Sequence, residues 1–134
     1  MFKDTKAFSG FSVGDIPAAK EFYGGILGLQ IEELSEPMPM LILHIATGGD
    51  ILIYPKGSDH EPASYTVLNF PVTEIDAAVN DLKLKGVNFV QLENSDMPQD
   101  EKSIMRGLAV NMGPDIAWFK DPAGNVLAVL QQQR

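Results

Sequence analysis

One internal repeat limits the fold of this chain more than any other feature. Residues 8–29, FSGFSVGDIPAAKEFYGGILGL, return in altered form 59 positions later. Five identical pairs align: Phe11 with Phe70, Val13 with Val72, Ile16 with Ile75, Ala18 with Ala77 and Ala19 with Ala78. Each copy has the pattern of a strand that leads into a helix, so the sequence predicts two versions of one small unit packed together.

The first repeat, about residues 6–55, predicts the order strand, helix, strand, strand, strand. Asp15 is a good helix N-cap, and Pro17 follows where a missing N–H costs nothing. Strands are expected at 7–14, 29–34, 40–46 and 51–54, with a hairpin turn from Thr47 to Asp50.

A polar linker at about 55–64 leads to the second repeat, about residues 65–132, for which we expect the same order. Strand 65–72 precedes a helix in which Thr73 and Asp76 suggest a capping box. Further strands are expected at 87–92, 116–120 and 126–131. Between them, residues 93–114 form a long irregular segment, of which 108–111 could be strand, and loops of this length are often lids or binding segments.

Length and composition predict one domain of 134 residues. With 45% hydrophobic residues, a chain of this size can bury a sufficient core without disulfide or metal cross-links. The net charge of −8 and the lack of a basic stripe argue against nucleic acid as a partner. Cysteine is absent, and no segment has the length of a membrane span or of a signal-peptide core. We therefore expect a cytoplasmic protein without a membrane partner.

Two motifs resemble the vicinal oxygen chelate superfamily, which includes glyoxalase I, bleomycin and fosfomycin resistance proteins and extradiol dioxygenases. They are VxDIxxAxxFYxxxLGL at 13–29 and WFKDPAGN at 118–125. The resemblance implies an α+β fold of two βαβββ repeats, whose curved mixed sheets form a cup with the helices outside. It also implies a ligand site in the cup and a homodimer.

In metal-using members of that superfamily, the first and last strand of each repeat supply the four metal ligands. Counting from the motifs carries these positions onto Phe8, Ile53, Val67 and Ala128, with Leu52 in place of Ile53 if the first hairpin is shifted by one residue. Carbon side chains donate no lone pair to a metal. We therefore expect no metal and no other cofactor, which puts glyoxalase or dioxygenase chemistry in doubt.

The remaining polar candidates are few. His44 lies in an apolar strand and is either a structural residue or a weak candidate for an acid or base. Strand alternation places Phe8 and Ser12 on the cup face of the first strand, and Asn69 beside Val67 on the second. His60, between Asp59 and Glu61, has the pattern of a solvated charge run rather than a metal site.

Larger side chains add three further candidates. Trp118 is either core packing or the mouth of a pocket for a flat ligand. Arg106 and Lys102 could orient an anionic molecule, although balancing nearby acidic residues is the favoured interpretation.

Three functions stay open from the sequence. The leading hypothesis is a metal-independent protein that binds a small, largely apolar molecule in the cup, lined by Phe8, Ser12, His44, Ile53, Val67, Asn69, Arg106, Trp118 and Ala128. The alternatives are a metal-dependent or His44-assisted lyase, dioxygenase or isomerase, and a structural or regulatory dimer without a ligand.

Overall fold

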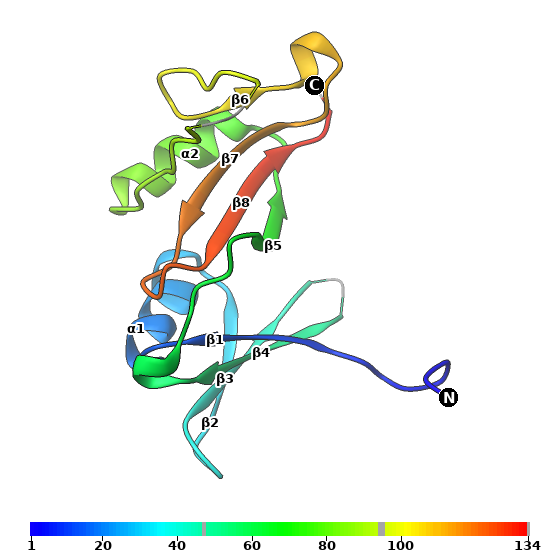
Figure 1. The fold of residues 1–134 in the computed structure, drawn as a ribbon, viewed down its shortest axis with the longest axis vertical. Helices are drawn as coiled ribbons and strands as arrows, with labels where there is room; N and C mark the ends of the chain where they lie inside the picture. Colours follow the sequence, from blue (N-terminus) through cyan, green and yellow to red (C-terminus); the bar gives the residue numbers. More distant parts are fainter. Residues whose placement is uncertain (47, 94–95, 134) are drawn as a thin grey trace. The chain divides into compact units, whose positions relative to one another are not determined.

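The computed structural model describes residues 1–46, 48–93 and 96–133. The chain divides into two compact units, Met1–Pro62 and Ala63–Arg134, and each unit contains one of the two repeats (Figure 1). Thr47, part of the expected hairpin turn, and residues 94–95 of the long irregular segment lie outside the described residues.

The first unit is a four-stranded mixed sheet with one helical segment. Its strands lie in the order β1-β4-β3-β2, with β1 parallel to β4 and the other pairs antiparallel. The elements are β1 (Ser9–Val13), α1 (Ile16–Lys20), the π-helix η1 (Glu21–Ile26), β2 (Gln30–Leu34), β3 (Met40–His44), β4 (Asp50–Pro55) and the short helix η2 (Gly57–Asp59).

The helix of the first unit starts as its sequence predicts. Asp15 is the N-cap, and its Oδ2 accepts the backbone N–H of Ala18 at 3.0 Å. The helix widens into η1 and ends before Gly28, whose φ of +74° is in the left-handed region that favours glycine. The N-cap prediction is confirmed.

The sheet of the second unit has the strand order β5-β8-β7-β6, which corresponds to that of the first unit. As in the first unit, the edge strand β5 is parallel to its neighbour β8. Its elements are β5 (Thr66–Pro71), α2 (Ile75–Leu84), β6 (Met105–Arg106), η3 (Leu108–Val110), β7 (Asp115–Lys120) and β8 (Val126–Gln131). The predicted α+β class with two βαβββ repeats is therefore confirmed, since both units share one topology.

The prediction of a strand at 87–92 is wrong. The prediction that 108–111 could be a strand is also wrong, because most of this segment is η3. Phe89 makes only a single bridge to Phe119, and the two rings lie 5.6 Å apart. Val90 donates its N–H to the carbonyl of Trp118, so this segment meets β7 without forming a ladder. The apolar pattern of residues 87–92 thus reflects packing, and the two-residue β6 is the second strand of this unit in chain order.

The prediction of a capping box at the start of α2 is also wrong. Glu74 is the N-cap and makes no side-chain cap, while Gln131 at the end of β8 accepts the N–H of Ile75 through Oε1 at 2.9 Å. Asp76 binds Lys102 and Arg106 instead. A residue distant in sequence therefore caps this helix, which local patterns do not indicate.

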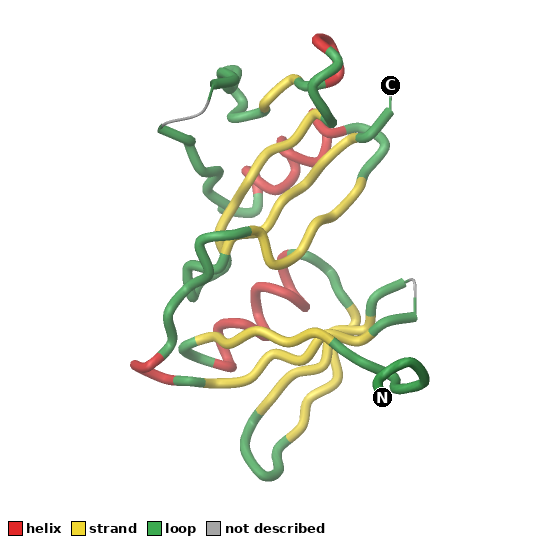
Figure 2. Tube along the Cα trace, turned by 45° about the vertical axis from the view of Figure 1, so that its right-hand side comes forward, coloured by secondary structure: helices red, strands yellow, loops and turns green. Residues whose placement is uncertain are grey.

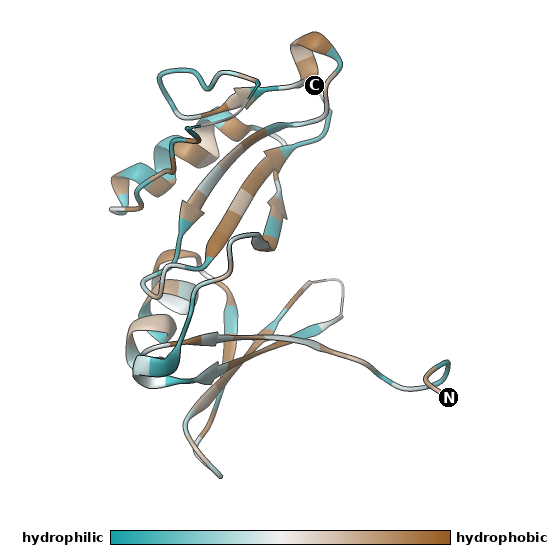
Figure 3. Cartoon of the chain, viewed as in Figure 1, coloured by the Kyte–Doolittle hydropathy of each residue, from teal (hydrophilic) through white to brown (hydrophobic). Residues whose placement is uncertain are grey.

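The helices cover one face of each sheet (Figure 2). In the first unit the covered face bears Phe11, whose ring lies 5.8 Å from that of Tyr23, together with the fully buried Leu41 and Ile53. In the second unit it bears Phe119 and Val129. Figure 3 shows β8 hydrophobic along most of its length, so apolar side chains also reach the uncovered face. Within the described residues, no helix is both long and apolar enough to cross a membrane.

Candidate functional site

The helix-free face of the second unit carries an amide and an indole in one row. Asn69 on β5 pairs with Ala128 on β8, and Ala128 pairs with Trp118 on β7. Cross-strand partners project to the same side of a sheet, so these three residues share the helix-free face, as the sequence predicts for Asn69 and Ala128. The next row on this face is Pro71, Leu130 and Ile116.

The exposure of this row suits contact with another molecule. The side chain of Asn69 is exposed, Trp118 is half-buried, and Ala128 between them is fully buried. Of the three, only the amide of Asn69 and the indole of Trp118 therefore reach the surface on this side of the sheet. Val67, the neighbouring candidate, lies at a register shift between Thr66 and Leu68, and no strand residue pairs with it.

The helix-free face of the first unit is built from the partners of Gly10 and Ser12. Gly10 pairs with Leu52, and Ser12 pairs with Tyr54. Ile53 pairs with Phe11 instead and is fully buried on the helix-covered face. The expectation that Ile53 shares a face with Ser12 is therefore wrong, because the hairpin is shifted by one residue and places Leu52 there. Phe8 precedes β1 and is 69% exposed.

His44 lies at the end of β3 between two carboxylates. Its Nδ1 is 2.9 Å from Asp50 Oδ1 and its Nε2 is 3.3 Å from Glu32 Oε1. The hydrogen bond to Asp50 is the main cause that raises the pKa of His44 above its ordinary value. Because the two carboxylates face opposite nitrogens of the ring, the three groups do not converge on a common point where an ion could bind.

The guanidinium group of Arg106 forms ion pairs with three carboxylates of the second unit. Its Nη2 and Nη1 lie 2.7 and 3.0 Å from Asp76, and its Nε lies 2.9 Å from Asp100. Lys102 Nζ adds a contact of 3.0 Å to Asp76, and Asp115 lies 3.6 Å from Arg106. Both cations thus tie residues 100–106 to α2. The sequence favours charge balance with nearby acidic residues, and the structure shows this for Asp100 but makes the distant Asp76 the shared partner.

The structure also joins two residues that no sequence motif connects. Ser12 Oγ on β1 lies 2.7 Å from Nδ1 of His60, which follows η2. The two residues are 48 positions apart, so their proximity has no signal in local spacing.

The four positions that the resemblance assigns to metal ligands do not fit a metal ion. Phe8, Ile53, Val67 and Ala128 offer only carbon atoms, and hydrocarbon side chains cannot replace the water ligands of a divalent cation. Across residues 1–46, 48–93 and 96–133, no three His, Asp or Glu side chains are grouped so that they could hold an ion.

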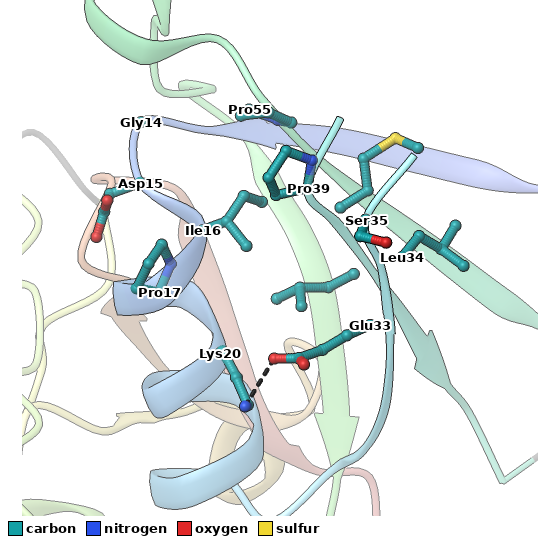
Figure 4. Close-up of a pocket in the computed structure, with 12 residues that line it drawn as sticks. Gly14, Asp15, Ile16, Pro17, Lys20, Glu33, Leu34, Ser35, Pro39 and Pro55 are labelled. Atoms are coloured by element: carbon teal, nitrogen blue, oxygen red, sulfur yellow. Dashed lines mark ion pairs between the residues drawn. The ribbon is translucent and has the colours of Figure 1, made fainter. Parts of the chain in front are cut away.

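A cavity of about 730 Å³ opens on the helix-covered side of the first unit (Figure 4). It lies between the start of α1 and the turn after β2, and the ion pair between Lys20 Nζ and Glu33 Oε1, 2.7 Å long, closes one side. Its other lining residues are Gly14, Asp15, Ile16, Pro17, Leu34, Ser35, Pro39, Met40, Leu41 and Pro55. This cavity contains none of the candidates that the sequence singles out.

A family model shows which superfamily the chain belongs to. The model of the Glyoxalase/Bleomycin resistance protein/Dioxygenase superfamily matches residues 8–129. The chain belongs to this superfamily. Its resemblance to the vicinal oxygen chelate proteins, inferred from two motifs, is thereby confirmed. No curated protein sequence matches the chain.

Several solved structures share the superfamily fold. TnmS3, an antibiotic-binding protein from Streptomyces sp. CB03234, is 20% identical with a TM-score of 0.65, over 97% of this chain and 98% of that chain. FosX, a fosfomycin resistance protein from Listeria monocytogenes, is 15% identical with a TM-score of 0.64, over 97% and 94%. The oxidase ChaP-H2 is 20% identical with a TM-score of 0.67, over 96% and 95%. At these identities the likeness extends to the fold alone.

Proposed function

We propose that this protein binds a small, largely apolar molecule without a metal ion, on the helix-free side of its sheets. The observation that carries the proposal is the row of Asn69, Ala128 and Trp118 on the second unit. An exposed amide beside an indole and an apolar surface is the composition of many ligand sites, in which a few polar groups orient an apolar body.

One observation favours this side of the sheet over the cavity beside α1, and two others support small-molecule binding by the scaffold. In that cavity Lys20 and Glu33 already neutralise each other, and the Asp15 carboxylate accepts the N–H of Ala18. The antibiotic-binding protein TnmS3 shares the fold, so the scaffold suits the binding of small molecules. The carbon side chains at the family ligand positions, with Leu52 in place of Ile53, favour binding through shape and apolar contact.

A thermal-shift screen of drug-sized apolar compounds, performed with a chelator present, tests the proposal. We expect at least one compound to raise the melting temperature of the wild type and to act less on Asn69→Ala. Asn80→Ala, which removes an exposed amide from α2, is the matched control and should respond like the wild type. The proposal fails if no compound raises the melting temperature, or if Lys20→Ala rather than Asn69→Ala removes the shift.

We also propose that the protein is a homodimer, as its superfamily resemblance implies. Sedimentation equilibrium across a range of protein concentrations gives the mass directly. A mass equal to that of one 14.6 kDa chain at all concentrations would contradict the proposal.

A further inference from the structure

The pair of Ser12 and His60 brings a hydroxyl and an imidazole together from positions 48 residues apart. Ser12 Oγ and His60 Nδ1 are 2.7 Å apart, which is hydrogen-bonding distance between a hydroxyl and an imidazole nitrogen. Both side chains are partly buried, and both belong to the first unit. A serine hydroxyl next to an imidazole is the arrangement in which a weak nucleophile is activated by a base.

The backbone around η2 holds His60 in this position. Lys56 donates its N–H to the carbonyl of Val13 at 2.9 Å, which joins the segment after β4 to the end of β1. The N–H of Asp59 then bonds to the carbonyl of Lys56, and that of His60 to the carbonyl of Gly57, which has a φ of +54°. The imidazole is therefore fixed relative to β1 by a short hydrogen-bonded turn rather than by its side chain alone.

Ser12 is only partly buried. It belongs to the helix-free face, where its strand partner is Tyr54, which is 37% exposed. The side chain of Tyr54 extends over Gly10, because a Cβ at Gly10 would lie 3.8 Å from the Tyr54 ring. A hydroxyl beside an aromatic ring on an uncovered sheet face suits an acyl donor with an aromatic leaving group.

We infer that Ser12 and His60 are a nucleophile and its base, able to take an acyl group from an activated aryl ester. This inference goes beyond the proposed ligand binding and does not depend on it. Because the pair supplies a nucleophile and a base but no oxyanion donor, the substrates are esters whose leaving group departs readily.

The step balances within the pair and the ester. His60 Nδ1 accepts the hydroxyl proton as Ser12 Oγ attacks the carbonyl carbon and forms a new C–O bond. The bond to the aryl oxygen breaks, the phenolate leaves with its electron pair, and the imidazolium passes the proton to solvent. Water then attacks the acyl-serine with His60 again as base, which releases a carboxylic acid and restores the hydroxyl.

Reaction of the 134-residue chain with p-nitrophenyl acetate tests the inference. We expect a burst of p-nitrophenolate and one acetyl group located at Ser12 by peptide mass mapping. Ser12→Ala abolishes both signals. His60→Asn, whose amide can keep a hydrogen bond to Ser12 but cannot act as the base, lowers the burst rate by about 100-fold. Ser9→Ala, on the same strand, is the control and reacts like the wild type.

Two results would overturn the inference. One is wild-type protein that shows no acetyl group at Ser12, for example because only lysines react. The other is a His60→Asn variant that is acetylated at Ser12 at the wild-type rate. Because the first result needs only wild-type protein, a variant that fails to fold leaves the inference testable.

Discussion

At the scale of single residues, His44 makes the stability of the first unit depend on pH. Its ring lies between Asp50 and Glu32, and the hydrogen bond to Asp50 raises the pKa of the ring in the folded state. The protonated ring therefore stabilises the folded state below the unfolded pKa of about 6.5, and this contribution disappears as the pH rises through the folded pKa.

Replacement of this histidine tests the effect. We expect His44→Gln to lower the melting temperature more at pH 5.5 than at pH 8.5, because only the charged ring attracts both carboxylates. Thermal denaturation followed by circular dichroism across this range measures the difference. A loss of equal size at both pH values would show that packing, not charge, accounts for the contribution of His44.

Gly107 has no room for a side chain. A Cβ at this position would lie 2.5 Å from the carbonyl oxygen of Pro114 and 2.8 Å from that of Gly113. We expect Gly107→Ala to lower the free energy of unfolding by about 1–3 kcal/mol, since backbone atoms must move to admit the methyl group. Urea denaturation measures the change.

Gly49→Ala is the matched control for this substitution. A Cβ at Gly49 would have no atom of the described residues within 4 Å, so the variant should unfold close to the wild-type midpoint. If both alanine variants unfold at the same urea concentration, the tight contact at Gly107 does not limit stability.

At the scale of elements, the carboxylate of Asp76 joins α2 to residues 100–106. Hydrogen bonds from Arg106, and then from Lys102, hold the pKa of the Asp76 carboxyl far below its ordinary value. The resulting stability is present above the unfolded pKa of about 3.9 and is lost as the pH falls through the folded pKa.

Asp76→Asn should therefore make the free energy of unfolding depend less on pH in the acid range. The variant is expected to be about 1 kcal/mol less stable than the wild type at pH 7, a modest figure because these side chains are partly exposed, and the difference should shrink below pH 3. Asp81→Asn is the control on the same helix, since the ion pair of Asp81 with Lys85 is an exposed i,i+4 contact, and its effect should be smaller. Equal effects of the two variants would contradict a special role for Asp76.

The elements differ in how far local sequence predicts them. The start of α1 was predictable, because its cap comes from Asp15, three residues before the N–H that it binds. The start of α2 was not, because Gln131 caps it from a distance of 56 residues. Likewise the apolar segment around Phe89 packs on Phe119 without becoming a strand, which its alternation alone does not reveal.

At the scale of the whole molecule, duplication made most of the fold predictable. Two copies of one pattern gave two sheets with the same strand order, and strand alternation placed Asn69 and Ala128 on the same face. The position of Trp118 on that face came from the structure. The register of the first hairpin decides whether Leu52 or Ile53 lies on the helix-free face. A shift of one residue moves each side chain to the opposite face of the sheet. Contacts between distant segments, such as Ser12 with His60, required the structure.

The most direct test of metal-free binding uses Trp118, the only tryptophan in the chain, as its reporter. The apolar dye Nile red, or the strongest compound from the screen, is titrated into chelator-treated protein while tryptophan emission is recorded. We predict a saturable change in emission for the wild type and about tenfold weaker binding for Asn69→Ala, which loses the hydrogen bond that orients the ligand. An emission that does not change, or that changes only after a divalent metal is added, would contradict the account.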